Sequence, residues 1–260
     1  MTSIAFSLIG HNEAHNLPRA LESIRWADEV IYVDCGSSDG SAEVARGYTS
    51  RVFSRPNNSN LNVNKSYGIQ QATADWVFYL DPDEVISPPL AGEIRAAIAA
   101  NPSENAFSLP RRNFYLGGWL RYGGQYPDIQ LRLFRRGKAR FPNRHVHEKL
   151  EVDGAVGSLR EPMSHYTNPT MTEVMNKLEF YSSFNAGLMR EGGRKPTVAM
   201  ALRYLFWMPV TRFLRRYFLK RGFRDGWPGL TVAIIDGLEI QLRFLKFCDL
   251  SRQNDGEPAP

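Results

Sequence analysis

The stretch Trp76-Val-Phe-Tyr-Leu80, followed directly by Asp81-Pro-Asp-Glu84, decides the fold. The first five residues form a continuous apolar run of aromatic and branched side chains, which is typical of a buried strand. The acidic segment stands where that strand ends. Pro88-Pro89 then begin a predicted helix that reaches about Ala100, because proline is favoured in the first turn. The sequence therefore predicts a strand, an acidic loop and a helix in succession.

The residues around this stretch predict an α/β fold with a helical C-terminal region. Through the first hundred residues, short apolar runs alternate with helical patterns, as in a mixed, mainly parallel sheet with crossover helices. Strands are expected at 4–9, 29–33, 51–53, 106–109 and 129–134, and helices at 17–24, 41–46 and 63–72. After Thr172, helices are expected at 172–190, 197–219 and 230–247. Asn16 is the expected cap of the first helix.

Composition bounds the class of protein. The chain has 260 residues, of which 43% are hydrophobic, enough for one large core or a core with an appendage. A net charge of +5 suits nucleic acid, an anionic membrane surface or a phosphorylated substrate. The excess of lysine and arginine lies mainly after Arg111, which leaves the first half comparatively acidic. We therefore expect no nucleic-acid partner.

Cysteine usage and hydropathy indicate a cytoplasmic protein. Cys35 and Cys248 lie far apart and form no CxxC pair, so neither a disulfide framework nor a thiolate metal site is expected. The first ten residues have no basic n-region, and no stretch reaches about 18 uninterrupted apolar residues. We expect neither export nor a membrane span.

Polar residues follow three of the predicted parallel strands. The first strand ends in Gly10-His-Asn-Glu13, the second in Asp34-Cys-Gly-Ser-Ser-Asp39, and the fourth in Asp81-Pro-Asp-Glu84. The carboxyl ends of such strands meet at one edge of the sheet, where ligands bind. Carboxylates would repel a bare phosphate, and neither GxGxxG nor GxxxxGK[ST] occurs. Mg²⁺ or Mn²⁺ resolves this conflict, since it binds carboxylates and diphosphate oxygens together.

These motifs resemble the family 2 glycosyltransferases, which have a GT-A fold, over about residues 3 to 150. The "NE" turn corresponds to Ser7 to Glu13, the "VDxGSxDGS" segment to Val33 to Ser41, and the DXD motif to Asp81-Pro-Asp83. The resemblance implies that Asp34 and the first-strand turn hold the nucleotide base, Asp81 the ribose side and Asp83 the metal. The implied nucleotide-sugar-binding residues are Ile9, His11, Glu13, Asp34, Ser37, Asn64, Lys65, Asp81 and Pro82. A structural alternative for Asp34 is an Asx turn with the residues that follow it.

Beyond the DXD motif the chain departs from the commonest family pattern. No Glu-Asp pair that would supply a general base follows Asp83. Asp128-Ile-Gln-Leu-Arg-Leu-Phe-Arg135 and Arg144-His-Val-His-Glu148 stand there instead, which looks like the lipopolysaccharide-core glucosyltransferases of the WaaE and LgtF type and the peptide glycosyltransferases of the SunS type. The segment 218–226 favours the lipopolysaccharide branch.

Catalytic roles follow from this second resemblance. Glu148 is the expected base and Asp128 the second candidate, although a salt bridge to Arg144 would also explain Glu148. His147 or His145 would complete the metal shell beside Asp83 or contact the diphosphate, and His147 also suits a structural role.

The resemblance implies a metal-dependent, inverting transfer of a hexose onto a glycan or lipid-linked acceptor. We expect glucose from UDP-glucose and the lipopolysaccharide inner core, with a peptide or other cell-envelope glycosyltransferase, or a metal-dependent nucleotidyltransferase, as alternatives. Residues 1–165 would form the GT-A domain, 166–252 a helical region and 253–260 a disordered tail.

The helical region suggests a membrane contact. Residues 197–221 are strongly apolar but interrupted by basic residues, and Arg212, Arg216 and Lys220 recur every four residues beside Arg215. Such a helix would lie on the inner face of the inner membrane. Alternatively, it packs on the core while its basic face is solvated or binds acceptor phosphates. Pro209 is expected to kink or split it.

Overall fold

The computed structural model describes residues 2–58, 60–142, 149–193 and 195–254, and its internal contacts divide the chain into two units. Unit 1 comprises Met1–Arg112 and Asp128–His165, and unit 2 comprises Asn113–Pro127 and Tyr166–Pro260. Residues 113–127 therefore group with the helices of unit 2 and not with the strands that flank them in sequence.

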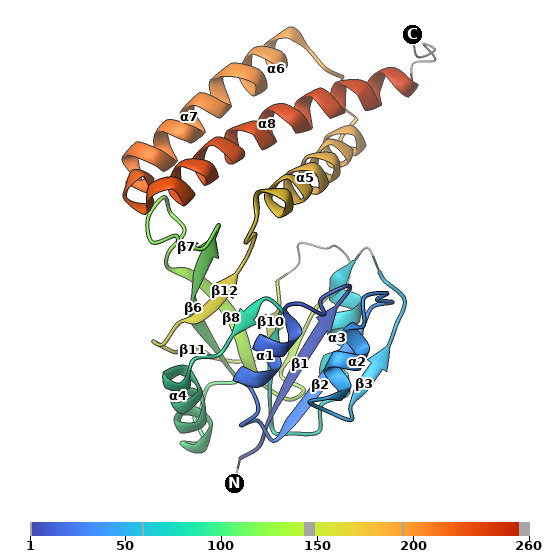
Figure 1. The fold of residues 1–260 in the computed structure, drawn as a ribbon, viewed down its shortest axis with the longest axis vertical. Coiled ribbons are helices and arrows are strands. Elements are labelled where there is room, and N and C mark those ends of the chain that lie inside the picture. Colours follow the sequence, from blue (N-terminus) through green and yellow to red (C-terminus); the bar gives the residue numbers. More distant parts are fainter. Residues whose placement is uncertain (1, 59, 143–148, 194, 255–260) are drawn as a thin grey trace. The chain divides into compact units, whose positions relative to one another are not determined.

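A mixed sheet organises unit 1 (Figure 1). Its strand order is β3 (Val52–Ser54), β2 (Glu29–Asp34), β1 (Ile4–Gly10), β4 (Trp76–Leu80), β8 (Asp128–Arg135), β6 (Ala106–Tyr115), β12 (Met163–Tyr166) and β5 (Glu84–Val85). The first four strands are parallel, and β8 is antiparallel to both β4 and β6. β11 (Val156–Ser158) pairs with β6, and β9 (Ala139–Arg140) forms a small separate sheet with β10 (Glu151–Val152). This is the mixed sheet with a parallel half that the sequence predicts.

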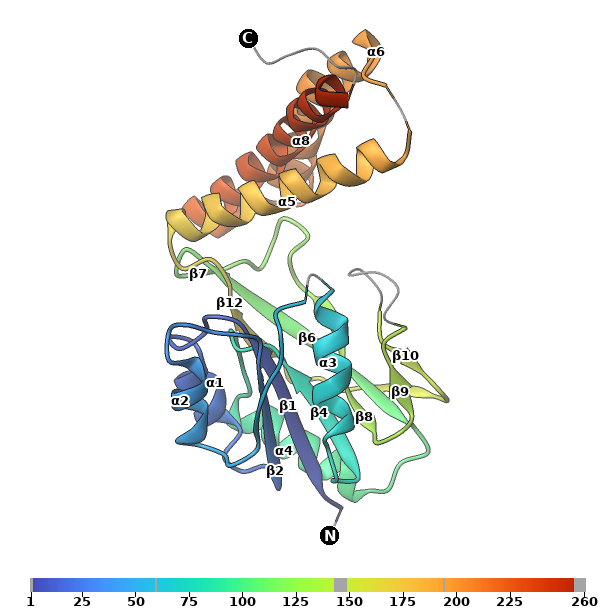
Figure 2. The same ribbon diagram turned by 90° about the vertical axis from the view of Figure 1, so that its right-hand side faces the viewer.

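Alternating side chains divide the core of unit 1 between the two faces of this sheet. On one face Phe6, Leu8 and Phe78 pack with α1 (Leu17–Ser23), α2 (Ser41–Arg46) and α4 (Pro88–Ala99). On the other face Ala5, Val33 and Val77 pack with residues around α3 (Leu61–Gln70), which is prominent in Figure 2. β6 runs past its predicted end at Leu109 because Pro110 and Arg111 stay paired with β8.

One predicted cap is wrong in its chemistry. Asn16 precedes α1, but its side chain accepts no hydrogen bond from the helix. Its Nδ2 instead donates to Glu13 Oε2 at 2.8 Å, and the backbone carbonyl of Glu13 accepts from the amides of Asn16 and Leu17. The turn from β1 therefore stabilises the helix start in place of the asparagine.

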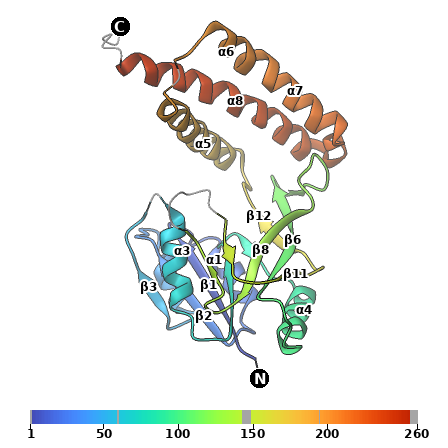
Figure 3. The same cartoon turned by 180° about the vertical axis from the view of Figure 1, so that it is seen from behind.

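Unit 2 is helical. Its elements are α5 (Met171–Glu191), α6 (Val198–Leu202), the π-helical turn η1 (Arg203–Trp207), α7 (Met208–Leu214), the π-helical turn η2 (Arg215–Leu219), the 3₁₀ turn η3 (Gly222–Asp225), α8 (Gly226–Asn254) and the short strand β7 (Gly118–Trp119). α8 packs along both α5 and α7 (Figure 3). The predicted tail begins at residue 253, but α8 continues to Asn254, and residues 255–260 lie outside the described chain.

Pro209 is accommodated inside the continuous helical run from Val198 to Leu219. Proline has no amide to donate to the carbonyl four residues earlier, which belongs to Leu205. Gln241 of α8 fills that place, since its Nε2 donates to the Leu205 carbonyl at 2.8 Å. The π turn η1 directly precedes α7, in which Pro209 is the second residue. None of the helices in the described ranges is long and apolar enough to cross a membrane.

Candidate functional site

The loops after β1 and β2 are tied together at the carboxyl edge of the sheet. Gly10 lies opposite Asp34 in the parallel register, so both strands end at the same level. Asn12 has a φ of 57°, its amide donates to Ser37 Oγ at 2.9 Å, and its Oδ1 accepts from the Ser38 amide at 2.8 Å. These contacts fix the shape of the edge before any ligand arrives.

Asp34 binds its own loop with one carboxylate oxygen, while the other has no partner among the described residues. The residue is buried, and its Oδ2 accepts from the Ser37 amide at 3.2 Å, so the side chain caps the turn that follows, three residues on instead of the two of an Asx turn. Its Oδ1 is also buried, yet it has no hydrogen-bond partner in the described part of the chain. A buried carboxylate oxygen without a donor is costly, so this atom is suited to a ligand N–H or O–H group.

Asp81 lies in an ion-pair network at the end of β4. Its Oδ1 is 2.9 Å from Lys65 Nζ, and its Oδ2 accepts from Arg132 at 2.9 Å. Partial burial alone would raise the pKa of Asp81, but these two cations outweigh it and hold the pKa far below its ordinary value. Asp81 is therefore ionised and already neutralised by protein groups.

The network continues inward to Glu84 and ends at Asp128. Glu84 is fully buried and its Oε1 accepts from Arg132 at 2.5 Å and from Arg111 at 2.9 Å. Arg111 also holds Asp128 through Nε at 2.9 Å and Nη2 at 2.7 Å. Burial opposes the charge of Arg132, but Glu84 and Asp81 raise its pKa above the ordinary value. Three cations thus balance three carboxylates in this network, from Lys65 to Asp128.

Asp83, the second aspartate of the DXD motif, has a different kind of neighbour. His165 at the end of β12 places Nε2 3.1 Å from Asp83 Oδ2. A carboxylate oxygen beside an imidazole nitrogen is a donor set that suits Mn²⁺, with the remaining ligands from diphosphate and water. The described residues contain no group of three or more His, Cys, Asp or Glu that would hold a metal by themselves. The pair therefore fits a metal that binds together with a diphosphate.

The remaining predicted donor-site residues divide into ligand-facing candidates and loop supports. Lys65 lies beside Asp81, whereas the buried Asn64 uses Nδ2 on the Pro56 carbonyl at 3.0 Å and on Cys35 Sγ at 3.2 Å. His11 Nδ1 is 2.9 Å from the Cys35 carbonyl. Ile9 and Pro82 are buried beside these loops. Their roles toward a donor remain predictions.

Three predicted residues fall outside the described chain. Glu148, His147 and His145 all belong to residues 143–148, whose placement is not described. Asp128, the second candidate for the base, is described and carries the two hydrogen bonds from Arg111. Hydrogen bonds to the ionised form stabilise it and make a carboxylate a weaker base.

Sequence reasoning missed the roles of Arg132, Arg111 and His165, and it named Glu84 only as part of the acidic loop at the sheet edge. Asp128, Gln130 and Arg132 alternate in the sequence, but the register of β8 against β6 shifts at Arg132, so the alternation alone does not predict where its side chain lies. His165 lies in the short strand β12, 82 residues from Asp83, and nothing in the sequence near either residue connects the two.

Comparison with known proteins decides the family. Residues 8–167 match the profile of glycosyl transferase family 2. The chain belongs to this family. The mixed α/β sheet with a C-terminal helical region is accordingly the predicted GT-A arrangement.

Several relatives are similar over most of their length. The chain is 29% identical over 234 residues to the lipopolysaccharide core biosynthesis glycosyltransferase LpsC of Rhizobium meliloti (strain 1021), which covers 86% of this chain and 83% of the relative. It is 27% identical over 264 residues to the uncharacterized glycosyltransferase RT0209 of Rickettsia typhi, covering 96% and 88%. Among solved structures, glucosyl-3-phosphoglycerate synthase of Mycobacterium tuberculosis, solved with Mn²⁺ and UDP-glucose, has a TM-score of 0.47 and 14% identity and covers 69% and 77% of the two chains. S. aureus TarS 1–349 has a TM-score of 0.48 and 12% identity over 97% and 92%.

Proposed function

We propose that this family 2 glycosyltransferase moves glucose from UDP-glucose, with inversion, onto the inner core of lipopolysaccharide. One arrangement carries the proposal: the carboxyl edge of one sheet holds both the unsatisfied oxygen of Asp34 and the pair Asp83–His165. Family membership favours glycosyl transfer over the nucleotidyl transfer considered above. The name of the LpsC relative supports the acceptor, for which a peptide or another cell-envelope glycan is the alternative.

We assign a task in donor binding to Asp34, Lys65 and the pair Asp83–His165. An ionised carboxylate only accepts hydrogen bonds, so Asp34 Oδ1 would accept from an N–H group at the edge of the base, which uracil offers. Lys65 brings an ammonium group to the end of β4, where it can turn toward a diphosphate. Asp83 and His165 would hold Mn²⁺ or Mg²⁺, which neutralises charge on the leaving diphosphate when it is bound.

The transfer itself needs a base. The acceptor oxygen bonds to the anomeric carbon from the face opposite the diphosphate, the bond to the diphosphate breaks, and its electron pair leaves with UDP. The proton of the acceptor hydroxyl goes to a carboxylate. We assign this role to Glu148, because Arg111 already binds Asp128.

Glu148→Gln should keep donor binding and lose roughly 10²–10⁴ in turnover. If Asp128→Asn abolishes turnover while Glu148→Gln leaves it intact, Asp128 is the base.

A thermal-shift screen of nucleotide sugars, each with Mn²⁺ and with EDTA, tests the donor. A ligand that binds only the folded state raises the apparent stability by RT ln(1 + [L]/Kd). UDP-glucose with Mn²⁺ should give the largest shift, and NMR of the product should show an inverted anomeric centre. A larger shift with another nucleotide sugar would replace UDP-glucose, and a retained configuration would exclude inversion.

The helical region supports attachment to the inner face of the inner membrane. Six apolar side chains, spaced four residues apart, are between 46% and 78% exposed: Val198, Leu202, Phe206, Val210, Leu214 and Phe218. In an α-helix a four-residue step overshoots one turn by about 40°, or roughly 200° over five steps. Each π turn holds one extra residue and so cancels about 100° of this rotation around the helix axis. The two turns η1 and η2 together therefore keep the apolar stripe on one side.

Basic residues on the same unit favour an anionic lipid surface as the occupant of the apolar stripe. Arg203, Arg221 and Arg224 are exposed, and each cation near such a surface adds about 1 kcal/mol of attraction. In liposome co-sedimentation, binding should require anionic lipid and weaken with salt. Phe206→Ser should reduce this binding. Phe180→Ser on α5 is the matched control, because its ring is equally exposed (63% against 64%) but does not belong to the apolar stripe, so binding should not change. Equal binding of both variants and the parent would exclude the apolar stripe as the membrane contact.

A further inference from the structure

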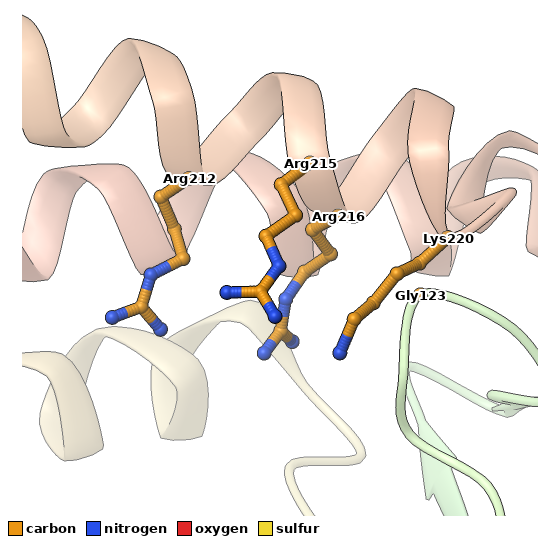
Figure 4. Close-up of a pocket in the computed structure, with 5 residues that line it drawn as sticks. All are labelled: Gly123, Arg212, Arg215, Arg216 and Lys220. Carbon is orange, nitrogen blue, oxygen red and sulfur yellow. The ribbon is translucent and has the colours of Figure 1, made fainter.

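Four basic side chains surround one pocket within unit 2 (Figure 4). Arg212 belongs to α7, Arg215 and Arg216 belong to η2, and Lys220 follows η2. Their charged ends extend from the helix to the same side, beside Gly123 of the loop 120–127. The cavity measures about 210 Å³, which is below the range of roughly 300–1,000 Å³ for small-molecule pockets. It suits a small charged group better than a whole sugar.

The π turn η2 explains why these side chains meet. The amide of Lys220 donates to the carbonyl of Arg215 at 2.8 Å, a bond that spans five residues. This wider turn brings Arg215 and Lys220 into line along the helix. Arg212, Arg216 and Lys220 are spaced four residues apart and already share that side. π turns often occur at functional sites.

The loop beneath the pocket is shaped in advance. The Gly123 amide donates to the Lys220 carbonyl at 2.9 Å, and Asp225 accepts from the amides of Arg121 at 3.1 Å and Tyr122 at 2.8 Å. Gly124 has a φ of 75°, and a Cβ there would lie 2.5 Å from Lys220 Nζ. Glycine therefore leaves the space through which the lysine side chain crosses the loop.

The charges of the pocket do not balance. Asp236 of α8 is 2.8 Å from Arg216 and 3.6 Å from Arg212. Within the described ranges, neither Arg215 nor Lys220 makes an ion pair. Burial lowers the pKa of Arg216, and the nearby Arg212 lowers it further against the pull of Asp236. Four cations against one carboxylate leave a surplus of three positive charges around one pocket.

We infer that this pocket binds a phosphate monoester carried by an anionic partner of the enzyme. Guanidinium groups form paired, charge-assisted hydrogen bonds with phosphate oxygens, and an ammonium adds a point charge beside them. A phosphorylated glycan acceptor and a lipid headgroup offer the same chemistry. That the phosphate belongs to the acceptor rests on the proposed function, whereas binding of the anion does not.

Calorimetric titration of the full chain with inorganic phosphate, at ionic strength matched with chloride, tests the pocket. Arg215→Gln and Lys220→Gln should each weaken phosphate binding by about tenfold or more. Arg203→Gln removes the same charge from an exposed position of η1 outside the pocket and should change it little. UDP binding with Mn²⁺ should be unchanged in all three variants, so a failure here differs from a failure of the donor site. No phosphate binding by the parent, or equal losses in Arg203→Gln and Arg215→Gln, would overturn the inference.

A vesicle experiment separates the two sources of phosphate. Neutral vesicles with and without phosphatidic acid are offered to the parent, to Arg215→Gln and to Arg190→Gln, which removes the same charge from an exposed position of α5 outside the pocket. If the headgroup is the ligand, only Arg215→Gln loses the binding that phosphatidic acid adds, and inorganic phosphate competes with it. If the acceptor is the ligand, vesicle binding is the same in both variants while phosphate titration still separates them.

Discussion

The two units use their positive charges in opposite ways. In unit 1 Lys65, Arg132 and Arg111 are each paired with carboxylates, and Glu84 at the centre is fully buried. In unit 2 the pocket of Arg212, Arg215, Arg216 and Lys220 faces one carboxylate, Asp236. A balanced, buried network fixes the protein's own geometry, because removing one member leaves an unpaired charge. An unbalanced and open cluster is suited to an external anion. The same residue types therefore indicate structure in one unit and binding in the other.

The largest effect should come from unbalancing the network of unit 1. Among the described residues, Arg132→Met leaves the buried Glu84 with Arg111 as its one cationic partner and deprives Asp81 of one of its two cations. We expect the free energy of unfolding to fall by about 3–5 kcal/mol, as for other buried pairs that lose one partner. Urea denaturation measures this. Arg140→Met is the matched control, because the Arg140–Glu151 pair is exposed and such pairs contribute about 1 kcal/mol or less. Equal losses in the two variants would mean that burial of the network is unimportant.

Asp83 sharpens the comparison because it belongs to the proposed donor site and lies outside the balanced network. Asp83→Asn should leave the free energy of unfolding nearly unchanged. It should weaken UDP binding in Mn²⁺ by about 100-fold, because losing a metal contact costs a few kcal/mol of binding free energy. The measurement is a UDP titration in Mn²⁺ and in EDTA. Asp153→Asn removes the same charge from an exposed pair with Lys138 and serves as the control. If the parent binds UDP equally well in EDTA, the metal role of Asp83 and His165 is wrong.

The sequence predicted unit 1 well where local pattern determines structure. The run Trp76–Leu80 is the strand that its composition indicates, and the acidic loop follows it as expected. Pairing partners were less predictable, because they depend on which strands become neighbours. Arg132 reaches Asp81 only because β8 lies beside β4, and His165 reaches Asp83 only because β12 pairs with β5. Long-range register, and not residue type, decides both contacts.

In unit 2 the sequence predicted the helices but not their π turns. The residues 197–219 read as one helix, and the repeat of basic residues at 212, 216 and 220 was visible in it. The turn η2 depends on a choice between bonds that span four and five residues, which local propensity barely separates. The loop that closes the pocket comes from residues 120–127, far away in sequence. The repeat of basic residues was therefore predictable, whereas the pocket was not.

The smallest effect should come from removing the one carboxylate of the pocket, and its sign is opposite to that of the unit 1 variants. Asp236 partly neutralises Arg216 and Arg212, so it competes with an incoming phosphate. Asp236→Asn should strengthen phosphate binding by about threefold to fivefold, since a partly exposed pair is worth up to about 1 kcal/mol. Glu239→Gln on the same helix removes an equal charge outside the pocket, where Glu239 pairs with Arg243. Calorimetry with inorganic phosphate should therefore show tighter binding for Asp236→Asn and little change for Glu239→Gln. Weaker binding for Asp236→Asn would mean that the carboxylate orients the arginines for their ligand, and the pocket would then resemble the network of unit 1 more than it differs from it.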